Sequence, residues 1–414
     1  MKKYLFILGL VGTALFTACS TSDDLTAEKP PVTPVVDQAD EAAMIREAGQ
    51  NSDVSISLGV GSSRGFTRSP LVPGEGGAFS TEDNRYLGVF CLSTGIQSGV
   101  DASLLPSNIR LNRWNSDDTG LLVRMKNVPA SVLSGDVTFM NSNATAVQTY
   151  YYPMGNWMKY NFYAYYPRQE ETVEFVGLDR PTIEFSKDDN NYYYLLEKYY
   201  EIDGTQDIIW GKADPPEGDA FSARYFIENV SADKPQFSFE HKLVQFRFFV
   251  KAANPDVADN VKITNMSVPN ALGYLALVIA NQNPAPVDSM KEGTIKVFDK
   301  KNVKKKLNVK WLSNDDNYKD KDRFDGTIGN ALAITTDAVD YNNPVGYLML
   351  ANPAIGKSRD GNFKYELQLD WAKKVGDDFV VQGIPISVEL SDDFAEGKIY
   401  NIVVTVNPDL NPTP

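Results

Sequence analysis

The sequence is poor in the residues that most often carry covalent or metal chemistry. It has two cysteines and one histidine among its 414 residues. With only His241 available, histidine-based catalytic triads and sites with several histidine ligands lack their parts. No spacing of acidic residues singles out a catalytic pair either. We therefore expect no enzymatic activity, no catalytic residue, no metal site and no cofactor.

The sequence also lacks an excess of positive charge and any second long apolar run. Its net charge is −14, which disfavours nucleic acid as a partner. The apolar run at residues 4–16 follows Lys2 and Lys3 and is too short to span a bilayer. This arrangement is typical of a signal peptide, which we place at residues 1–18.

Cys19 follows two small residues, Thr17 and Ala18, in a stretch that resembles a bacterial lipobox. This pattern predicts cleavage before Cys19 and lipidation of its thiol, although a plain secretory signal with a chance cysteine is the alternative. The proline-containing stretch that follows predicts a tether over residues 19–52. The remaining cysteine, Cys91, has apolar neighbours and is expected to be a buried free thiol.

The rest of the sequence reads as strands. Short alternating or apolar segments recur between turn residues, and no long helical period interrupts them. This pattern predicts an all-β fold built from sandwich domains, which we place at residues 53–232 and 233–414. Within 237–250 the apolar residues change parity, which predicts a bulge or bend between His241 and Gln245.

The first predicted strand lies beside a loop that a protease could reach. Its alternating apolar residues share one face: Val54, Ile56, Leu58 and Val60. The Gly/Ser-rich stretch after it contains Arg64 and Arg68, and such exposed loops are preferred sites of cleavage. The next strand is predicted at residues 86–92. An ordinary first strand followed by an ordinary loop is the alternative.

Three other patterns have ordinary structural explanations. Residues 351–358 resemble a phosphate-binding loop, but the alternation at 363–371 predicts a strand where that loop needs a helix. The lysines at 300–310 are typical of a guarded edge hairpin, with a heparin or nucleic-acid patch as the alternative. The tyrosine clusters, such as 150–152, favour cross-strand pairing over stacking on sugar rings.

Four stretches together resemble the fimbrillin family, the Mfa-like type V pilins of Gram-negative gut and oral anaerobes. They are the lipobox at Cys19, residues 150–167, residues 207–213 with 237–243, and residues 397–406. The resemblance implies two tandem transthyretin-like β-sandwich domains and export by the lipoprotein machinery to the outer membrane and cell surface.

The resemblance also implies assembly rather than catalysis. An arginine-specific protease would cut after Arg68, or after Arg64 as the second choice, and would remove the strand that holds Val54, Ile56 and Leu58. A strand from another pilin subunit would then take its place. The prolines of residues 407–414 argue against a donating extension, so we expect a tip or accessory subunit of a pilus that serves adhesion to a host or bacterial surface ligand.

Two other classes of protein remain open from the sequence. One is an uncut surface lipoprotein that binds glycans or anchors a fimbria, and it would need an exposed aromatic platform. The other is an uncharacterised hydrolase, which would need a polar pocket with clustered carboxylates.

Overall fold

The computed structural model describes residues 38–61, 86–97, 119–133, 135–155, 157–169, 183–186, 195–215, 221–281, 291–297, 304–312, 325–356, 363–390 and 393–407, with the single residues Leu105, Ile109, Asn112 and Trp114. Strands dominate these residues, which confirms the predicted all-β class. The longer helices are α2 (Gln38–Ala48), α4 (Ala223–Glu228) and α5 (Pro255–Asn260). No helix in these described ranges is both long and apolar enough to cross a membrane.

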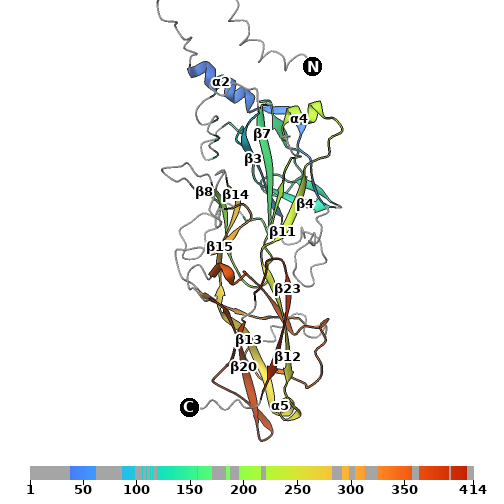
Figure 1. Ribbon diagram of the computed structural model, residues 1–414, viewed down its shortest axis with the longest axis vertical. Helices are drawn as coiled ribbons and strands as arrows, with labels where there is room; N and C mark the ends of the chain where they lie inside the picture. Colours follow the sequence, from blue (N-terminus) through green and yellow to red (C-terminus); the bar gives the residue numbers. More distant parts are fainter. Residues whose placement is uncertain are drawn as a thin grey trace, which may run out of the picture. The chain divides into compact units, whose positions relative to one another are not determined.

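Seven strands close into a barrel in the order β10, β11, β2, β5, β4, β3 and β7. Their bounds are β2 (Leu58–Val60), β3 (Leu87–Ile96), β4 (Val123–Leu133), β5 (Asp136–Phe139), β7 (Met158–Tyr166), β10 (Ile209–Ala213) and β11 (Gln236–His241). The long strands β3 and β7 lie side by side and antiparallel (Figure 1). Closure pairs every strand on both sides, so the barrel path itself has no free edge.

The core of the barrel is rich in tyrosine. Strand alternation turns one side of each strand inward, and in this sequence several of those inward residues are tyrosines. Tyr160, Phe162 and Ala164 of β7 are buried, as the alternation of this segment predicts. The hydroxyl group of Tyr160 donates to the carbonyl oxygen of Leu121 at 2.7 Å, so this phenol is buried with its polar end satisfied. Cys91 on β3 is also fully buried, as predicted, and is a free thiol.

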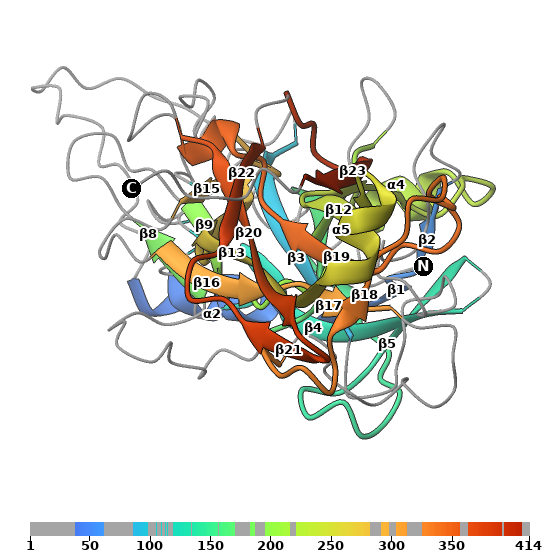
Figure 2. The ribbon, with the colours of Figure 1, turned by 90° about the horizontal axis from the view of Figure 1, so that it is seen from below.

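Two further sheets are formed mainly by later residues. One has the order β17, β19, β12, β23, and the other has the order β16, β13, β20, β21, with β18 on β13 and β22 on β20 (Figure 2). The bounds are β12 (Val244–Ala252), β13 (Val261–Leu272), β16 (Lys304–Asn308), β17 (Lys310–Trp311), β18 (Leu332–Ala333), β19 (Gly346–Leu350), β20 (Tyr365–Val375), β21 (Asp378–Val381), β22 (Ile386–Leu390) and β23 (Ile399–Val406). Helix α5 begins where the Asn254 side chain accepts from the Val257 N–H at 3.0 Å.

A four-stranded sheet combines early and late parts of the chain. It has the order β15, β14, β9, β8, with bounds β8 (Ile183–Ser186), β9 (Leu195–Glu201), β14 (Tyr274–Asn281) and β15 (Ile295–Val297). Strand β9 lies before the predicted domain boundary at residues 232/233, whereas its neighbour β14 lies after it. Strand β11, just after that boundary, pairs with β2 and β10 in the barrel. The division into two domains stays a prediction.

The predicted bend between His241 and Gln245 is the point where the chain changes sheets. Strand β11 ends at His241 in the barrel, and β12 begins at Val244 in another sheet. Between them, the Lys242 N–H donates to Ile208 and the Leu243 carbonyl accepts from Gly397. The parity of inward residues therefore changes because the two strands face different partners.

In its described part, residues 304–310, the lysine-rich stretch lies on sheet edges, and its two strands β16 and β17 do not pair with each other. Strand β16 is the edge of the sheet that contains β13, and β17 is the edge of the sheet that contains β12. Lys304 and Lys306 on β16 are exposed, whereas Leu307 is buried. The two short strands thus lie at the edges of two different sheets. The chain passes from one sheet to the other at Val309, the residue between them.

Candidate assembly site

The stretch around Val54 to Val60 forms two strands where the sequence predicted one. Strand β1 (Asn51–Ser55) pairs with β6 (Tyr151–Pro153), and β2 enters the barrel after a break at Ile56 and Ser57. The prediction of one continuous strand was therefore wrong. The alternation itself survives the break, since Ile56, Leu58 and Val60 are buried while Ser57 is exposed. Val54, the fourth residue of the predicted face, is only half-buried.

Strand β2 closes the barrel with a short ladder. It pairs antiparallel with β5 and parallel with β11, and each pairing has two registered residue pairs. The backbone N–H groups of Gly59 and Gly61 donate to Pro235 and Phe237 at 2.9 and 3.0 Å. Few hydrogen bonds therefore hold this strand. Its own side chains Leu58 and Val60 and the preceding Ile56 nevertheless lie in the core.

Arg124 fastens the segment before this break. Its Nε donates to the carbonyl oxygen of Tyr151 at 2.6 Å and its Nη1 donates to that of Gly49 at 2.9 Å. Its Nη2 also contacts the Asn51 side chain. One guanidinium from β4 thus ties the end of α2, β1 and β6 together, and these charge-assisted bonds are stronger than neutral ones.

The other predicted residues of this site lie outside the described residues. These are the lipidation residue Cys19 and the two cleavage candidates, Arg64 and Arg68. Described backbone ends at Gly61 after β2 and resumes at Tyr86, just before the long barrel strand β3. The segment predicted to leave and the strand predicted to stay are therefore separate elements of the same barrel.

His241 forms a buried pair with Asp207, which the sequence did not indicate. Its Nδ1 lies 2.6 Å from the Asp207 Oδ2, and the two side chains are only 2% and 0% exposed. This pair lies beside the crossover between β11 and β12, where Gly397 packs against His241. Within the described ranges, no cluster of three or more histidine, cysteine or acidic residues could hold a metal ion.

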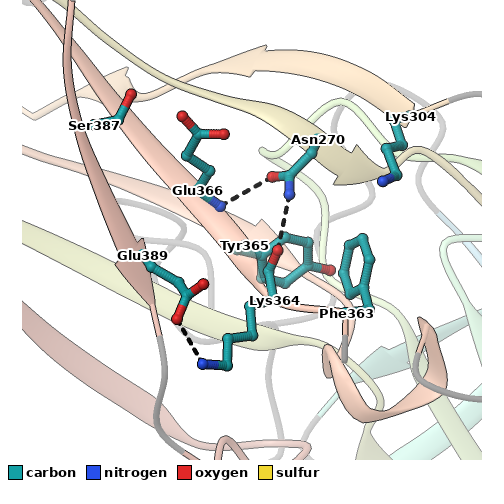
Figure 3. Close-up of a pocket in the computed structure, with 8 residues that line it drawn as sticks. All are labelled: Asn270, Lys304, Phe363, Lys364, Tyr365, Glu366, Ser387 and Glu389. Atoms are coloured by element: carbon teal, nitrogen blue, oxygen red, sulfur yellow. Dashed lines mark hydrogen bonds and ion pairs between the residues drawn. The ribbon is translucent and has the colours of Figure 1, made fainter. Parts of the chain in front are cut away.

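A polar pocket of about 460 Å³ lies between β13, β16, β20 and β22 (Figure 3). Its polar groups largely satisfy one another. The Asn270 amide donates to the Lys364 carbonyl and accepts from the Glu366 N–H, and Lys364 pairs with Glu389 at 2.5 Å. Its two aromatic residues, Phe363 and Tyr365, are 5% and 0% exposed. The pocket therefore offers a sugar little ring surface on which to stack.

The aromatic residues elsewhere in the described ranges are mostly internal. The largest fully buried side chains include Tyr152, Tyr163, Tyr199 and Tyr200, consistent with packing rather than a platform. Among large hydrophobic residues that the structure places at the surface, the one aromatic is Tyr341, which packs edge-on against Phe249.

No protein-family model matches the chain, and no curated protein sequence matches it. It is similar to a candidate cell adhesion protein from Bacteroides uniformis at 14% identity and a TM-score of 0.40, over 85% of this chain and 93% of that one. A candidate cell adhesion protein from Bacteroides eggerthii has 12% identity and a TM-score of 0.34, with 87% of each chain covered. A fimbrial protein from Bacteroides ovatus has 11% identity and a TM-score of 0.22, over 87% of this chain and 50% of that one.

Proposed function

We propose that this protein is a structural subunit of a pilus, exported as a lipoprotein and assembled by exchange of its first strand. The observation that supports the proposal is the position of β2. This three-residue strand fills the place between β5 and β11 in the barrel, and it precedes the stretch that contains Arg64 and Arg68. A cut in that stretch would separate β2 from β3 without touching any other barrel strand.

Loss of the segment would create a specific acceptor site. The ladder groups of β5 and β11 that face β2 would lose their partners, and the core would lose Ile56, Leu58 and Val60. A strand from another subunit with alternating apolar residues would satisfy both needs at once. The function is therefore assembly at the cell surface, with an adhesive tip or accessory subunit as the role and no catalytic activity.

N-terminal sequencing of protein extracted from the cell surface tests the cleavage step. We expect a mature chain that begins at Ser69. Arg68→Lys moves the cut to Arg64, and the double variant Arg64→Lys/Arg68→Lys stays uncut and does not join pili. Arg46→Lys is the matched control, because Arg46 precedes the segment and a cut there would leave β2 in place.

A different result would overturn the exchange step. A surface protein that begins only at acylated Cys19 and resists an arginine-specific protease would be an uncut fimbrial anchor or a glycan-binding lipoprotein.

Lipidation is tested separately with Cys19→Ala. We expect this variant to lose incorporation of labelled palmitate and to leave the membrane fraction, because the acylated residue is gone. Unchanged membrane attachment of the Ala variant would contradict the lipoprotein assignment.

A further inference from the structure

Strand β23 forms an open edge of its sheet. It pairs with β12 on one side and stands last in the order β17, β19, β12, β23, and no other strand in the described part of the chain pairs with it. The pairing with β12 runs from Gln245 with Ile399 to Ala252 with Val406 without a shift of register. The edge is therefore long and regular, and such an edge offers a row of backbone groups to another strand.

The backbone groups of alternate residues in β23 point away from β12. The Gln245 N–H donates to the Lys398 carbonyl oxygen at 3.0 Å, and the Ala253 N–H donates to that of Val406 at 2.8 Å. Successive residues of a strand turn their backbone groups to opposite sides, so the even-numbered residues face β12. The odd-numbered residues of β23 face the open side, and their side chains are exposed: Ile399, Asn401, Val403 and Thr405.

The strand has none of the features that usually protect an edge. Proteins guard sheet edges with charged side chains, prolines, bulges or very short strands. The sequence of β23 is IYNIVVTV, with no charged residue and no proline. Among the edge strands of four or more residues in the described ranges, it is the one without a charged residue. The others contain Asp53, Glu184, Lys304, Asp378 and Glu389.

The lack of charge indicates which partner fits this edge. The whole chain carries 54 acidic and 40 basic residues, so two copies repel each other over most of their surfaces. Pairing of two copies through a charged edge such as β16 would also bring like charges together, which is destabilising. A partner recognised by its charge finds no opposite charge on β23. A second copy of β23, in contrast, presents the same uncharged and unguarded edge.

We propose that two copies of this chain pair through β23, antiparallel and about a two-fold axis at Ile402, so that their two four-stranded sheets become one. Asn401 then lies opposite the partner's Val403, and Ile399 lies opposite the partner's Thr405. Each of these pairs exchanges two backbone hydrogen bonds, because both residues turn their groups outward. An axis at Asn401 or at Val403 would leave Thr405 or Ile399, respectively, without a partner residue in β23.

The side chains agree with this register. On the side that faces the core, Tyr400 lies opposite the partner's Val404, and pairs of an aromatic with a β-branched residue stabilise antiparallel strands. On the other side, Ile399 and Val403 are 43% and 37% exposed in the single chain, and each gains a neighbour. The contact needs no cleavage and neither copy gives up a strand, so it is separate from the proposed exchange at the barrel.

Analytical ultracentrifugation of the uncut chain from Ser20 onward tests the proposal. This chain carries no lipid and keeps β2 in its barrel, so strand exchange does not contribute to its association. A contact through one pair of strands is small beside the roughly 1,600 Å² of a standard complex, so we expect a reversible dimer with micromolar affinity. The dimer should become tighter between 50 mM and 500 mM NaCl, because salt screens the repulsion between acidic copies and the strand itself has no charge to screen.

Two charge variants test both the edge and the register. Val403→Lys should weaken the dimer at least tenfold, because it brings a lysine from each copy close to the two-fold axis. Asn401→Asp should weaken it for the same reason with the opposite charge. An equal mixture of the two variants should dimerise again, because this register sets the new lysine of one copy directly opposite the new aspartate of the other. Val230→Lys is the matched control, since Val230 is 88% exposed and lies outside β23.

Both variants are expected to keep the fold, because Asn401 and Val403 are exposed. Their urea midpoints at about 1 µM chain, where a micromolar dimer is largely dissociated, should match the wild type. The proposal is overturned if the wild-type chain stays monomeric up to about 200 µM, or if Val403→Lys leaves the dimer unchanged. A mixture of the variants that stays as monomeric as its components, or growth of the wild type beyond a dimer, would also overturn it, since a two-fold contact is closed.

Discussion

Replacing Leu58 by Ala tests how much β2 contributes to the uncut barrel. Leu58 is 1% exposed and pairs with Val137 of β5, so its side chain belongs to the core. Substitution of a buried Leu by Ala costs about 2–5 kcal/mol, because apolar burial is lost and a cavity remains. Such a loss is a large part of the stability of an ordinary domain, about 5–15 kcal/mol.

Urea unfolding of the uncut chain measures this loss. We expect a lower midpoint for Leu58→Ala with an unchanged dependence on urea concentration, since the surface exposed on unfolding hardly changes. Ser57→Ala is the matched control because Ser57 is the exposed neighbour of this residue, and its stability should stay within about 0.5 kcal/mol of the wild type.

The same variant also reports whether the segment leaves. If maturation removes residues before Ser69, the processed chains of Leu58→Ala and of the wild type have identical sequences and must unfold at the same urea concentration. The reasoning is refuted if the uncut variant is as stable as the wild type. Processed Leu58→Ala protein that remains destabilised would show that the segment is retained.

Further predictions concern the barrel core and buried ionisable groups. Gly88→Ala should cost about 1–3 kcal/mol or more in urea unfolding, since the new Cβ would lie 2.2 Å from the Cε1 of buried Tyr165, whereas Gly329→Ala meets no atom within 4 Å and should be neutral. Burial raises the pKa of Tyr152, Tyr200 and Tyr365. Above about pH 10 the unfolded chain therefore loses phenolic protons that the folded chain keeps, and the free energy of unfolding should fall as the pH rises; equal urea midpoints at pH 8 and pH 11 would contradict this. Burial also raises the pKa of the Cys91 thiol, so a maleimide should label Cys91 in 8 M urea but not in the native chain.

The sequence predicted the burial of side chains better than the pairing of strands. Alternation indicated correctly that Ile56, Leu58 and Val60 are buried, because it depends on which side of the backbone each residue occupies. It could not reveal the break at Ser57, since the residues keep alternating while their hydrogen-bond partner changes from β6 to the barrel. Which strands this segment pairs with depends on residues far away in the sequence, so its own alternation cannot show the change.

The change of parity of the apolar residues near His241 told more about strand pairing than the alternation at residues 54–60 did. A slip of one residue reverses the buried face, and the structure places a change of sheet there. For the lysine-rich stretch, the sequence correctly predicted positions at a sheet edge. It did not reveal that β16 and β17 lie at the edges of two different sheets.

The parallel pairing of β12 with β23 has a mechanical consequence. The two strands pair over eight registered residue pairs, from Gln245 with Ile399 to Ala252 with Val406. A pull transmitted from the barrel enters β12 at Val244, and a pull on the residues after β23 acts at Val406, which is the opposite end of the pair. Such a force slides the strands along each other and stretches all of the ladder bonds together, instead of opening them one at a time. The rate of rupture under tension, rather than the free energy of unfolding, then sets how long this part of the fold withstands the force.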